Sequence, residues 1–225
     1  MARKIAKLVG MLSMAFGVFI LGYYMFPFVN YEIQARTEFY QHVSPVPEGS
    51  READNYQGGA IDYTRASNWF AASPTDFGYP KVGFYTVTIE KLGIADMAVA
   101  IGGEDLSESL VQYAGEVLPG GNGKFTVFGH SILPRFYDPT DPLAVFSTLH
   151  QLSDGDEILV KYDGVAYKYV VEDMFEVKPE DTYILDQDAS GPTVQLVTCT
   201  PPGHPLRPRR LVVKAKLVPH DSGSI

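Results

Sequence analysis

Two stretches decide the fold of this chain: Val194-Gln195-Leu196-Val197-Thr198-Cys199-Thr200, which holds its one cysteine, and Arg210-Leu211-Val212-Val213, which opens a second apolar run. In residues 210–217 one parity is wholly apolar, whereas the other carries three basic residues. This two-residue period is typical of a β-strand with one buried face. The two runs therefore predict neighbouring strands joined by a loop.

Similar short runs recur upstream, separated by Gly, Pro and Asp-Gly turns. Together with the first two they give seven or eight expected strands, of which the clearest cover residues 84–89, 97–100, 124–129, 157–162, 166–172, 194–198 and 210–218. Many short strands at close spacing are typical of an all-β barrel or sandwich. Residues 104–113, with acidic residues in the first turn, predict a short helix, and residues 146–152 a second.

Strand parity places three reactive side chains at strand ends. Cys199 shares a face with Val197, and His130, at the end of the strand expected over 124–129, shares a face with Phe128. Arg210 lies on the face opposite the apolar parity of its strand, so all three side chains are expected to point away from the barrel core. A thiol becomes a nucleophile when a base stands beside it, and arginine can hold a carbonyl oxygen. The alternative, a buried and inert cysteine, stays open on the residues alone.

An uncharged stretch of 24 residues, 8–31, follows Arg3, Lys4 and Lys7. As a helix it would span about 36 Å, enough for a hydrocarbon core of about 30 Å. The positive-inside rule places residues 1–7 in the cytoplasm and the rest of the chain outside. A cleaved signal peptide is the alternative, but its apolar region would be only about 7 to 15 residues and would end at small residues. We therefore expect a single-pass membrane anchor.

Residues 32–80 are rich in Pro, Gly and polar residues, and we interpret them as an extracellular spacer. Their aromatic residues are too many for a fully solvated tether, so residues 66–70 are expected to dock on the domain at 81–218. Residues 219–225 form a polar tail. The chain carries 27 acidic against 18 basic residues, a net charge of −9, which argues against a nucleic-acid partner.

The order of three motifs resembles the sortase family of membrane-anchored cysteine transpeptidases: Val127-Phe128-Gly129-His130-Ser131, then Leu196-Val197-Thr198-Cys199-Thr200, then Arg210-Leu211-Val212-Val213. The family's cysteine motif reads Thr-Leu-x-Thr-Cys, with a Gly-His motif upstream and an Arg-hydrophobic strand downstream. Here Gln195 stands at the leading Thr position. The resemblance covers roughly residues 81–218.

The resemblance implies a closed eight-stranded β-barrel with short helices, preceded here by the transmembrane helix. It makes Cys199 the nucleophile, His130 the acid and base, and Arg210 the residue that orients substrate and oxyanion, with Arg209 as the alternative arginine. The candidates for substrate contact are Thr198, Val197 and Phe128. For Thr198, an inward-packed strand threonine is an equally good interpretation.

The implied reaction is acyl transfer in two steps. Cys199 attacks a carbonyl in a C-terminal sorting signal resembling Leu-Pro-x-Thr-Gly on a surface protein, and a thioacyl enzyme forms. An amine of a cell-wall precursor or a pilin then resolves it. A pilus-type sortase often carries an Asp-Pro-aromatic lid and a second membrane segment. Trp69 here follows Asn68 and the C-terminus is polar, which favours a housekeeping-like enzyme.

Two rival functions stay open: a wall-facing cysteine hydrolase or L,D-transpeptidase-like enzyme, and a non-catalytic anchored β-domain that binds surface proteins. The L,D-transpeptidase family places His and Gly directly before its cysteine, whereas Val197 and Thr198 stand there in this chain. No metal site or cofactor is predicted. Some sortases bind calcium through loop acids, and the candidate ligands here, which we instead interpret as a solvated surface, are Asp138, Asp141, Glu172, Glu176 and Glu180.

Overall fold

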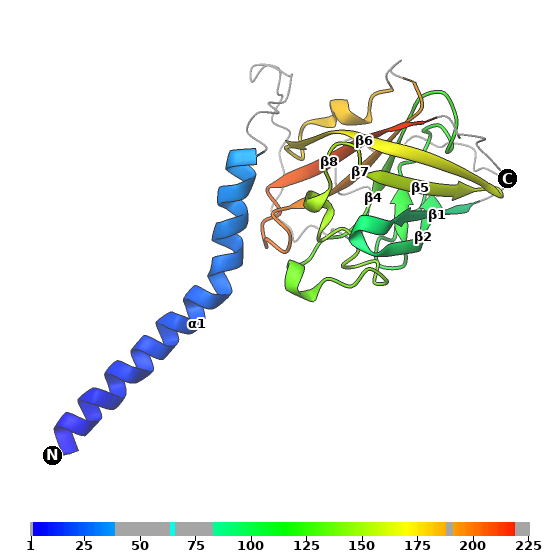
Figure 1. Ribbon diagram of the computed structural model, residues 1–225. Helices are drawn as coiled ribbons and strands as arrows, with labels where there is room; N and C mark the ends of the chain where they lie inside the picture. Colours follow the sequence, from blue (N-terminus) through cyan, green and yellow to red (C-terminus); the bar gives the residue numbers. More distant parts are fainter. Residues whose placement is uncertain (1, 39–63, 66–82, 188–190, 219–225) are drawn as a thin grey trace. The chain divides into compact units, whose positions relative to one another are not determined.

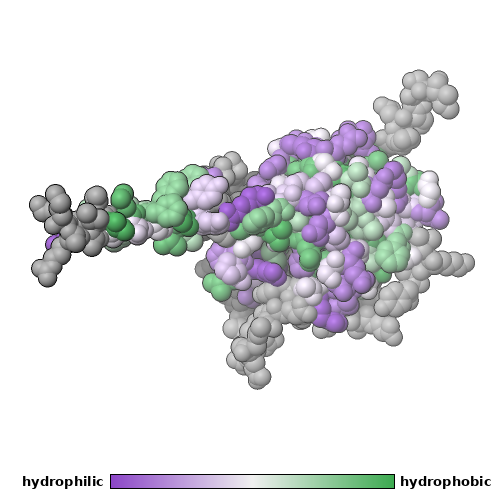
Figure 2. Space-filling model, turned by 90° about the horizontal axis from the view of Figure 1, so that it is seen from below, coloured by the Kyte–Doolittle hydropathy of each residue, from purple (hydrophilic) through white to green (hydrophobic). Residues whose placement is uncertain are grey.

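The computed structural model describes residues 2–38, 64–65, 83–187 and 191–218, which fall into two units that we describe separately. The first unit is a single helix, α1 (Ala2–Glu38). Its segment Val9–Phe26 is long and apolar enough to cross a membrane, and none of that segment is buried against protein. Figure 2 shows apolar side chains exposed on this helix. The helix contains the uncharged stretch 8–31 and is compatible with a membrane anchor.

The second unit is a closed barrel of eight strands, which confirms the predicted fold class (Figure 1). The strands follow each other around the barrel in the order β1-β2-β3-β4-β7-β8-β6-β5. Their bounds are β1 Phe84–Ile89, β2 Ile94–Ile101, β3 Leu110–Gln112, β4 Lys124–Phe128, β5 Glu157–Tyr162, β6 Val165–Val177, β7 Thr193–Thr200 and β8 Arg209–Leu217. Among the described residues the connections between strands contain the short 3₁₀ helices η3 Glu90–Leu92, η4 Pro134–Phe136, η5 Leu149–Gln151 and η6 Thr182–Leu185.

Apolar side chains on the inward face of each strand fill the inside of the barrel. The ring of Phe125 on β4 makes T-shaped contacts with Tyr85 on β1 and with Tyr169 on β6, at centroid distances of 6.1 and 5.7 Å. On β7 and β8 the inward residues include Leu196, opposite Val213 in the antiparallel register. The inward face predicted for residues 211–217 is therefore confirmed, whereas β7 is buried along its whole length and shows no alternation of burial.

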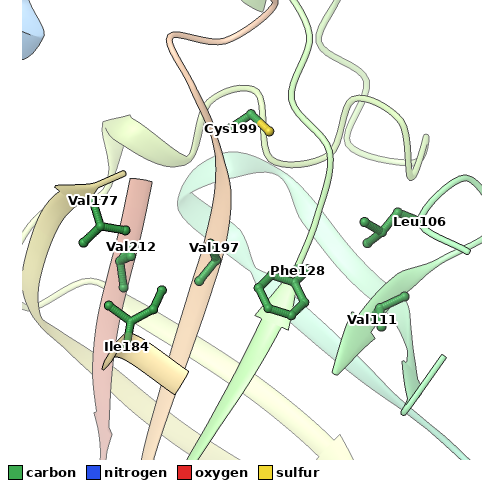
Figure 3. Close-up of a cluster of buried hydrophobic side chains, with 8 residues drawn as sticks. All are labelled: Leu106, Val111, Phe128, Val177, Ile184, Val197, Cys199 and Val212. Atoms are coloured by element: carbon green, nitrogen blue, oxygen red, sulfur yellow. The ribbon is translucent and has the colours of Figure 1, made fainter. Parts of the chain in front are cut away.

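The outer side of β4, β7 and β8 is also apolar near one end, and other segments cover it. Phe128, Val197 and Val212 point outward there and are fully buried. Figure 3 shows the cluster they form with covering side chains from other segments, among them Leu106 and Ile184. This covered outer face adjoins Cys199 and positions the candidate site.

The helix predicted over residues 104–113 is wrong. Asp105 Oδ1 instead accepts hydrogen bonds from both the backbone N–H and the hydroxyl of Ser107, which forms a turn. Leu110–Gln112 then becomes β3, parallel to β2 and antiparallel to β4. Two-sided strand pairing thus overrides the local helical pattern. The second predicted helix, 146–152, is reduced to a turn and η5.

Two residues of the predicted spacer contact the barrel. The carbonyl oxygen of Thr64 accepts a hydrogen bond of 2.8 Å from the backbone N–H of Leu106. Arg65 forms an isolated antiparallel bridge with Asp105 and an ion pair of 3.8 Å with Glu104. The expected docking segment 66–70 and the polar tail lie outside the described residues.

Candidate active site

The registers of three strands bring His130, Cys199 and Arg210 to the same level of the barrel. Cys199 and Arg210 are direct cross-strand partners in the β7–β8 pair. In the parallel β4–β7 pair Phe128 lies opposite Val197, so two residues further along each chain His130 is level with Cys199. His130 lies just past the end of β4, since the strand stops at Phe128, one residue earlier than predicted.

Hydrogen bonds extend the β4–β7 contact beyond the last paired residues. The N–H of Gly129 donates to the carbonyl oxygen of Val197 at 3.1 Å. The hydroxyl of Thr198 donates to the carbonyl oxygen of Gly129 at 2.8 Å, and that of Ser131 to the carbonyl oxygen of Cys199 at 2.6 Å. These bonds hold the backbone on both sides of His130 against the strand that carries Cys199. The motif 127–131 contains Ser131, but sequence reasoning gave it no role.

Gly129 is required by close packing next to His130. A Cβ atom there would lie 2.4 Å from the ring of Phe146 and 2.5 Å from the side chain of Leu110. Distances below 3.0 Å are essentially never seen for real Cβ atoms. The Gly-His pair in the sequence therefore has a steric reason in this fold.

The three side chains point outward by parity, as predicted, but they are not exposed. Cys199 is 2% exposed, His130 6% and Arg210 0%. The cluster in Figure 3 accounts for the burial of Cys199, whose sulfur stands at its upper edge. Sequence parity could indicate direction but could not reveal this cover, because Leu106 and Ile184 come from distant segments.

The cover is fixed to β4 by a buried lysine. Lys124 Nζ donates to the carbonyl oxygens of Ile184 and Asp186, at the end of η6. The side-chain amide of Gln187 bonds both the N–H and the carbonyl group of Lys124, at 3.2 and 2.9 Å. Together these contacts hold residues 184–187 over the outer face of the barrel.

Burial raises the pKa of the Cys199 thiol above its ordinary value, and the positive charges of Arg210 and Arg207 oppose that shift. The neutral thiol is therefore favoured in the unliganded protein. A nucleophilic role requires that a neighbouring base accept the proton.

The two candidate arginines have separate positions. Arg210 Nη1 donates to the carbonyl oxygens of Arg207 and Arg209 at 3.0 and 3.2 Å. Arg209, on the opposite face of β8, has its Nε 3.0 Å from a carboxylate oxygen of Glu176. Of the two, Arg210 is the one that the register places beside Cys199.

The residues predicted to contact substrate lie differently. Val197 and Phe128 form the outer face under the cover, so a ligand reaches them only if covering side chains move. Thr198 points inward, and its hydroxyl already bonds Gly129, which fits its interpretation as a packed strand threonine.

Among the described residues no group of three or more His, Cys, Asp or Glu side chains could hold a metal ion. Two of the five candidate calcium ligands have cationic partners, Glu176 with Arg209 and Glu172 with Lys214. Asp138 and Asp141 accept hydrogen bonds from Thr140 and Leu143 within their own loop.

Comparison with known proteins gives a consistent result. A family model described as a sortase domain matches residues 87–218. Similar solved structures include a Clostridium perfringens sortase D5 transpeptidase, with 29% identity over 61% of this chain and 79% of that one and a TM-score of 0.51. A lid mutant of Corynebacterium diphtheriae sortase A has 27% identity over 64% of this chain and 74% of that one, with a TM-score of 0.54. Actinomyces oris sortase C-1 has 31% identity over 60% of this chain and 73% of that one, with a TM-score of 0.52. No curated protein matches the chain significantly.

Proposed function

Since the chain belongs to the sortase family of cysteine transpeptidases, we propose that it cleaves a Leu-Pro-x-Thr-Gly-like sorting signal and transfers the acyl part to an amine. The observation that carries this proposal is the common level of His130, Cys199 and Arg210, set by two independent strand registers. These three residues supply a nucleophile, a proton carrier and a permanent cation. Such a set suits acyl transfer.

In the first step Cys199 Sγ attacks the carbonyl carbon of the scissile peptide bond, and the thiol proton passes to His130. Arg210 stabilises the negative charge that develops on the carbonyl oxygen. His130 returns its proton to the leaving amine as the C–N bond breaks, and a thioacyl enzyme remains. An acceptor amine then attacks the thioester carbonyl carbon and gives up a proton to His130. The new amide forms as the C–S bond breaks, and His130 returns that proton to the Cys199 sulfur.

The acceptor proposed is an amine of a cell-wall precursor or a pilin, and the donors are surface proteins with C-terminal sorting signals. We propose that α1 anchors the enzyme as a single-pass helix with residues 1–7 in the cytoplasm and the barrel outside the cell. The barrel needs no cofactor for this reaction, because the chain itself supplies every reacting group. A housekeeping-like role, serving many surface proteins, remains our preferred subclass.

The buried outer face adds a condition to substrate entry. Phe128 and Val197 are fully covered, so an extended peptide can contact them only when side chains of the surrounding cluster move aside. This makes the segment between β6 and β7 part of the proposed binding site.

The test uses the full chain in detergent micelles with a fluorogenic Leu-Pro-x-Thr-Gly peptide library and an amine acceptor such as triglycine. The proposal predicts a transpeptidation product that carries the acceptor, and its loss in the Cys199→Ala variant. A product that persists in Cys199→Ala would refute the proposal. Tight peptide binding without cleavage by the wild-type protein would favour the non-catalytic alternative.

A further inference from the structure

A buried carboxylate lies on the inner side of the barrel directly behind the candidate site. Glu176 stands near the end of β6, and its side chain is 8% exposed. Its two oxygens have different partners: Oε2 lies 3.0 Å from Arg209 Nε, and Oε1 accepts a 3.1 Å hydrogen bond from the hydroxyl of Thr200. A carboxylate with so little access to water is stable only when such partners compensate its charge.

The partners of Glu176 are the chain neighbours of the reactive residues. Thr200 and Arg209 form the cross-strand pair next to Cys199 and Arg210 at the open ends of β7 and β8. Successive residues of a strand point to opposite faces. Thr200 and Arg209 therefore point inward, whereas Cys199 and Arg210 point outward. Glu176 thus joins the ends of β6, β7 and β8, which lie side by side in the barrel (Figure 1).

The network also reaches the guanidinium of Arg210. One of the two carbonyl oxygens that bind Arg210 Nη1 belongs to Arg209, whose side chain is held by Glu176. If the ion pair with Glu176 were lost, the Arg209 side chain would no longer anchor the backbone at the start of β8. The Arg209 carbonyl oxygen that binds Arg210 Nη1 would then be held less firmly. The contact between Glu176 and Arg209 thus links the carboxylate to the backbone that holds Arg210.

We propose that Glu176 is a positioning residue for the transpeptidation: by holding Arg209 and Thr200 on the inner face, it keeps Arg210 beside Cys199 on the outer face. The inference rests on the proposed function. It also explains why two adjacent arginines are not equivalent, since one is held by Glu176 and only the other accompanies the thiol.

The test compares Glu176→Gln with a matched control in the full-length protein in detergent. The control is Glu172→Gln, on the same strand, where Glu172 pairs with Lys214 of β8 at 3.5 Å and is 40% exposed. We measure kcat and KM for peptide cleavage, and the pH profile of Cys199 alkylation by iodoacetamide. The second measurement needs no sorting signal, so it tests Glu176 even if the proposed substrate is wrong.

We expect Glu176→Gln to lower kcat by about tenfold with a much smaller change in KM, as for loss of an interaction made in the transition state. The alkylation profile should move to higher pH, because a displaced Arg210 favours the thiolate less. Glu172→Gln should match the wild type in both. The double variant Glu176→Gln/Arg209→Gln should lose less kcat than the two single variants combined, since the residues act as one unit.

A purely structural role gives another pattern. If Glu176→Gln lowers only the melting temperature, and leaves kcat and the alkylation profile equal to those of the wild type, the inference is overturned. Should that variant not fold, Arg209→Gln carries the same test, because it removes the charge that pairs with Glu176. An unchanged kcat and alkylation profile in Arg209→Gln would likewise overturn the inference.

Discussion

Replacing Glu116 by Gln should change how the stability of the barrel depends on pH. Glu116 lies in the loop between β3 and β4, where its carboxylate accepts hydrogen bonds from the backbone N–H of Thr126 and, at 2.9 Å, from the Thr126 hydroxyl. Desolvation raises the pKa of Glu116 from 4.5 to about 7, although the Thr126 bonds and the charge of Lys124 oppose the shift. Its ionised form is therefore disfavoured in the folded protein.

The sign follows from proton binding. Between pH 4.5 and about 7 the folded protein holds the Glu116 proton while the unfolded chain has lost it. The free energy of unfolding consequently falls as the pH rises through this window, and the contribution of the protonated form is complete below 4.5. At about 1.4 kcal/mol per pH unit the interval corresponds to at most about 3.4 kcal/mol. Glu116 is only partly buried, so solvent screening reduces the expected value to about 1–2 kcal/mol.

The assay is urea unfolding of the full-length protein in detergent, followed by near-ultraviolet circular dichroism at pH 4.5, 6 and 8. The variant Glu116→Gln has the same shape and no ionisable group. Its unfolding free energy relative to the wild type should rise by about 1–2 kcal/mol from pH 4.5 to pH 8. The control Glu157→Gln alters a carboxylate that is 61% exposed in an ion pair with Lys168, and its difference should stay flat. An equally flat difference for Glu116→Gln would refute the argument.

Three further predictions concern the site and its surroundings. Arg210→Gln should move the pH profile of Cys199 alkylation upward, because a cation that lowers the thiol pKa is lost, and should reduce kcat by about 100-fold. Gly129→Ala should destabilise the barrel by about 1–3 kcal/mol in urea unfolding, since the added methyl overlaps the ring of Phe146. Treatment with EDTA should leave peptide cleavage unchanged, because the proposed reaction uses side chains of the chain alone.

Each of these three predictions can be contradicted by a specific result. Arg210→Lys keeps the charge, so a profile that shifts as far as in Arg210→Gln would contradict the electrostatic reason. Gly83→Ala adds a methyl group with no atom within 4 Å at a position without a positive φ, as at Gly129, and so serves as the control without overlap. Gly129→Ala must cost more than that control. Loss of activity in EDTA that calcium restores would show that a metal site exists after all.

The parts of the site that follow from short-range patterns could be predicted from sequence. Alternation along 210–217 predicts that Arg210 lies on the outer side of its strand, and the cross-strand register puts Cys199 on the same side. Along 194–199 both faces carry apolar residues, so the pattern there did not decide the direction of Cys199. β3 was missed because its three residues are too few to show a period, and its pairing with β2 and β4 depends on distant segments. A pattern within a few residues of sequence cannot reveal such distant partner strands.

Burial and ion pairing at the site were also beyond sequence reasoning. The cluster on the outer face includes Leu106 and Ile184, which no spacing rule connects with the strand that carries Cys199. Glu176 was grouped with the solvated acids because its partner, Arg209, lies 33 residues away on another strand. Its inward direction follows from a register shift in β6 between Val171 and Asp173, a local irregularity that the sequence does not signal.

The most direct test of the central claim is intact-mass spectrometry of the full-length protein after mixing with a Leu-Pro-x-Thr-Gly peptide and no acceptor amine. The account predicts a covalent adduct with the mass of the acyl fragment, located on Cys199 by proteolytic mapping and removed by hydroxylamine or triglycine. Peptide cleavage without any adduct, or an adduct on another residue, would contradict it.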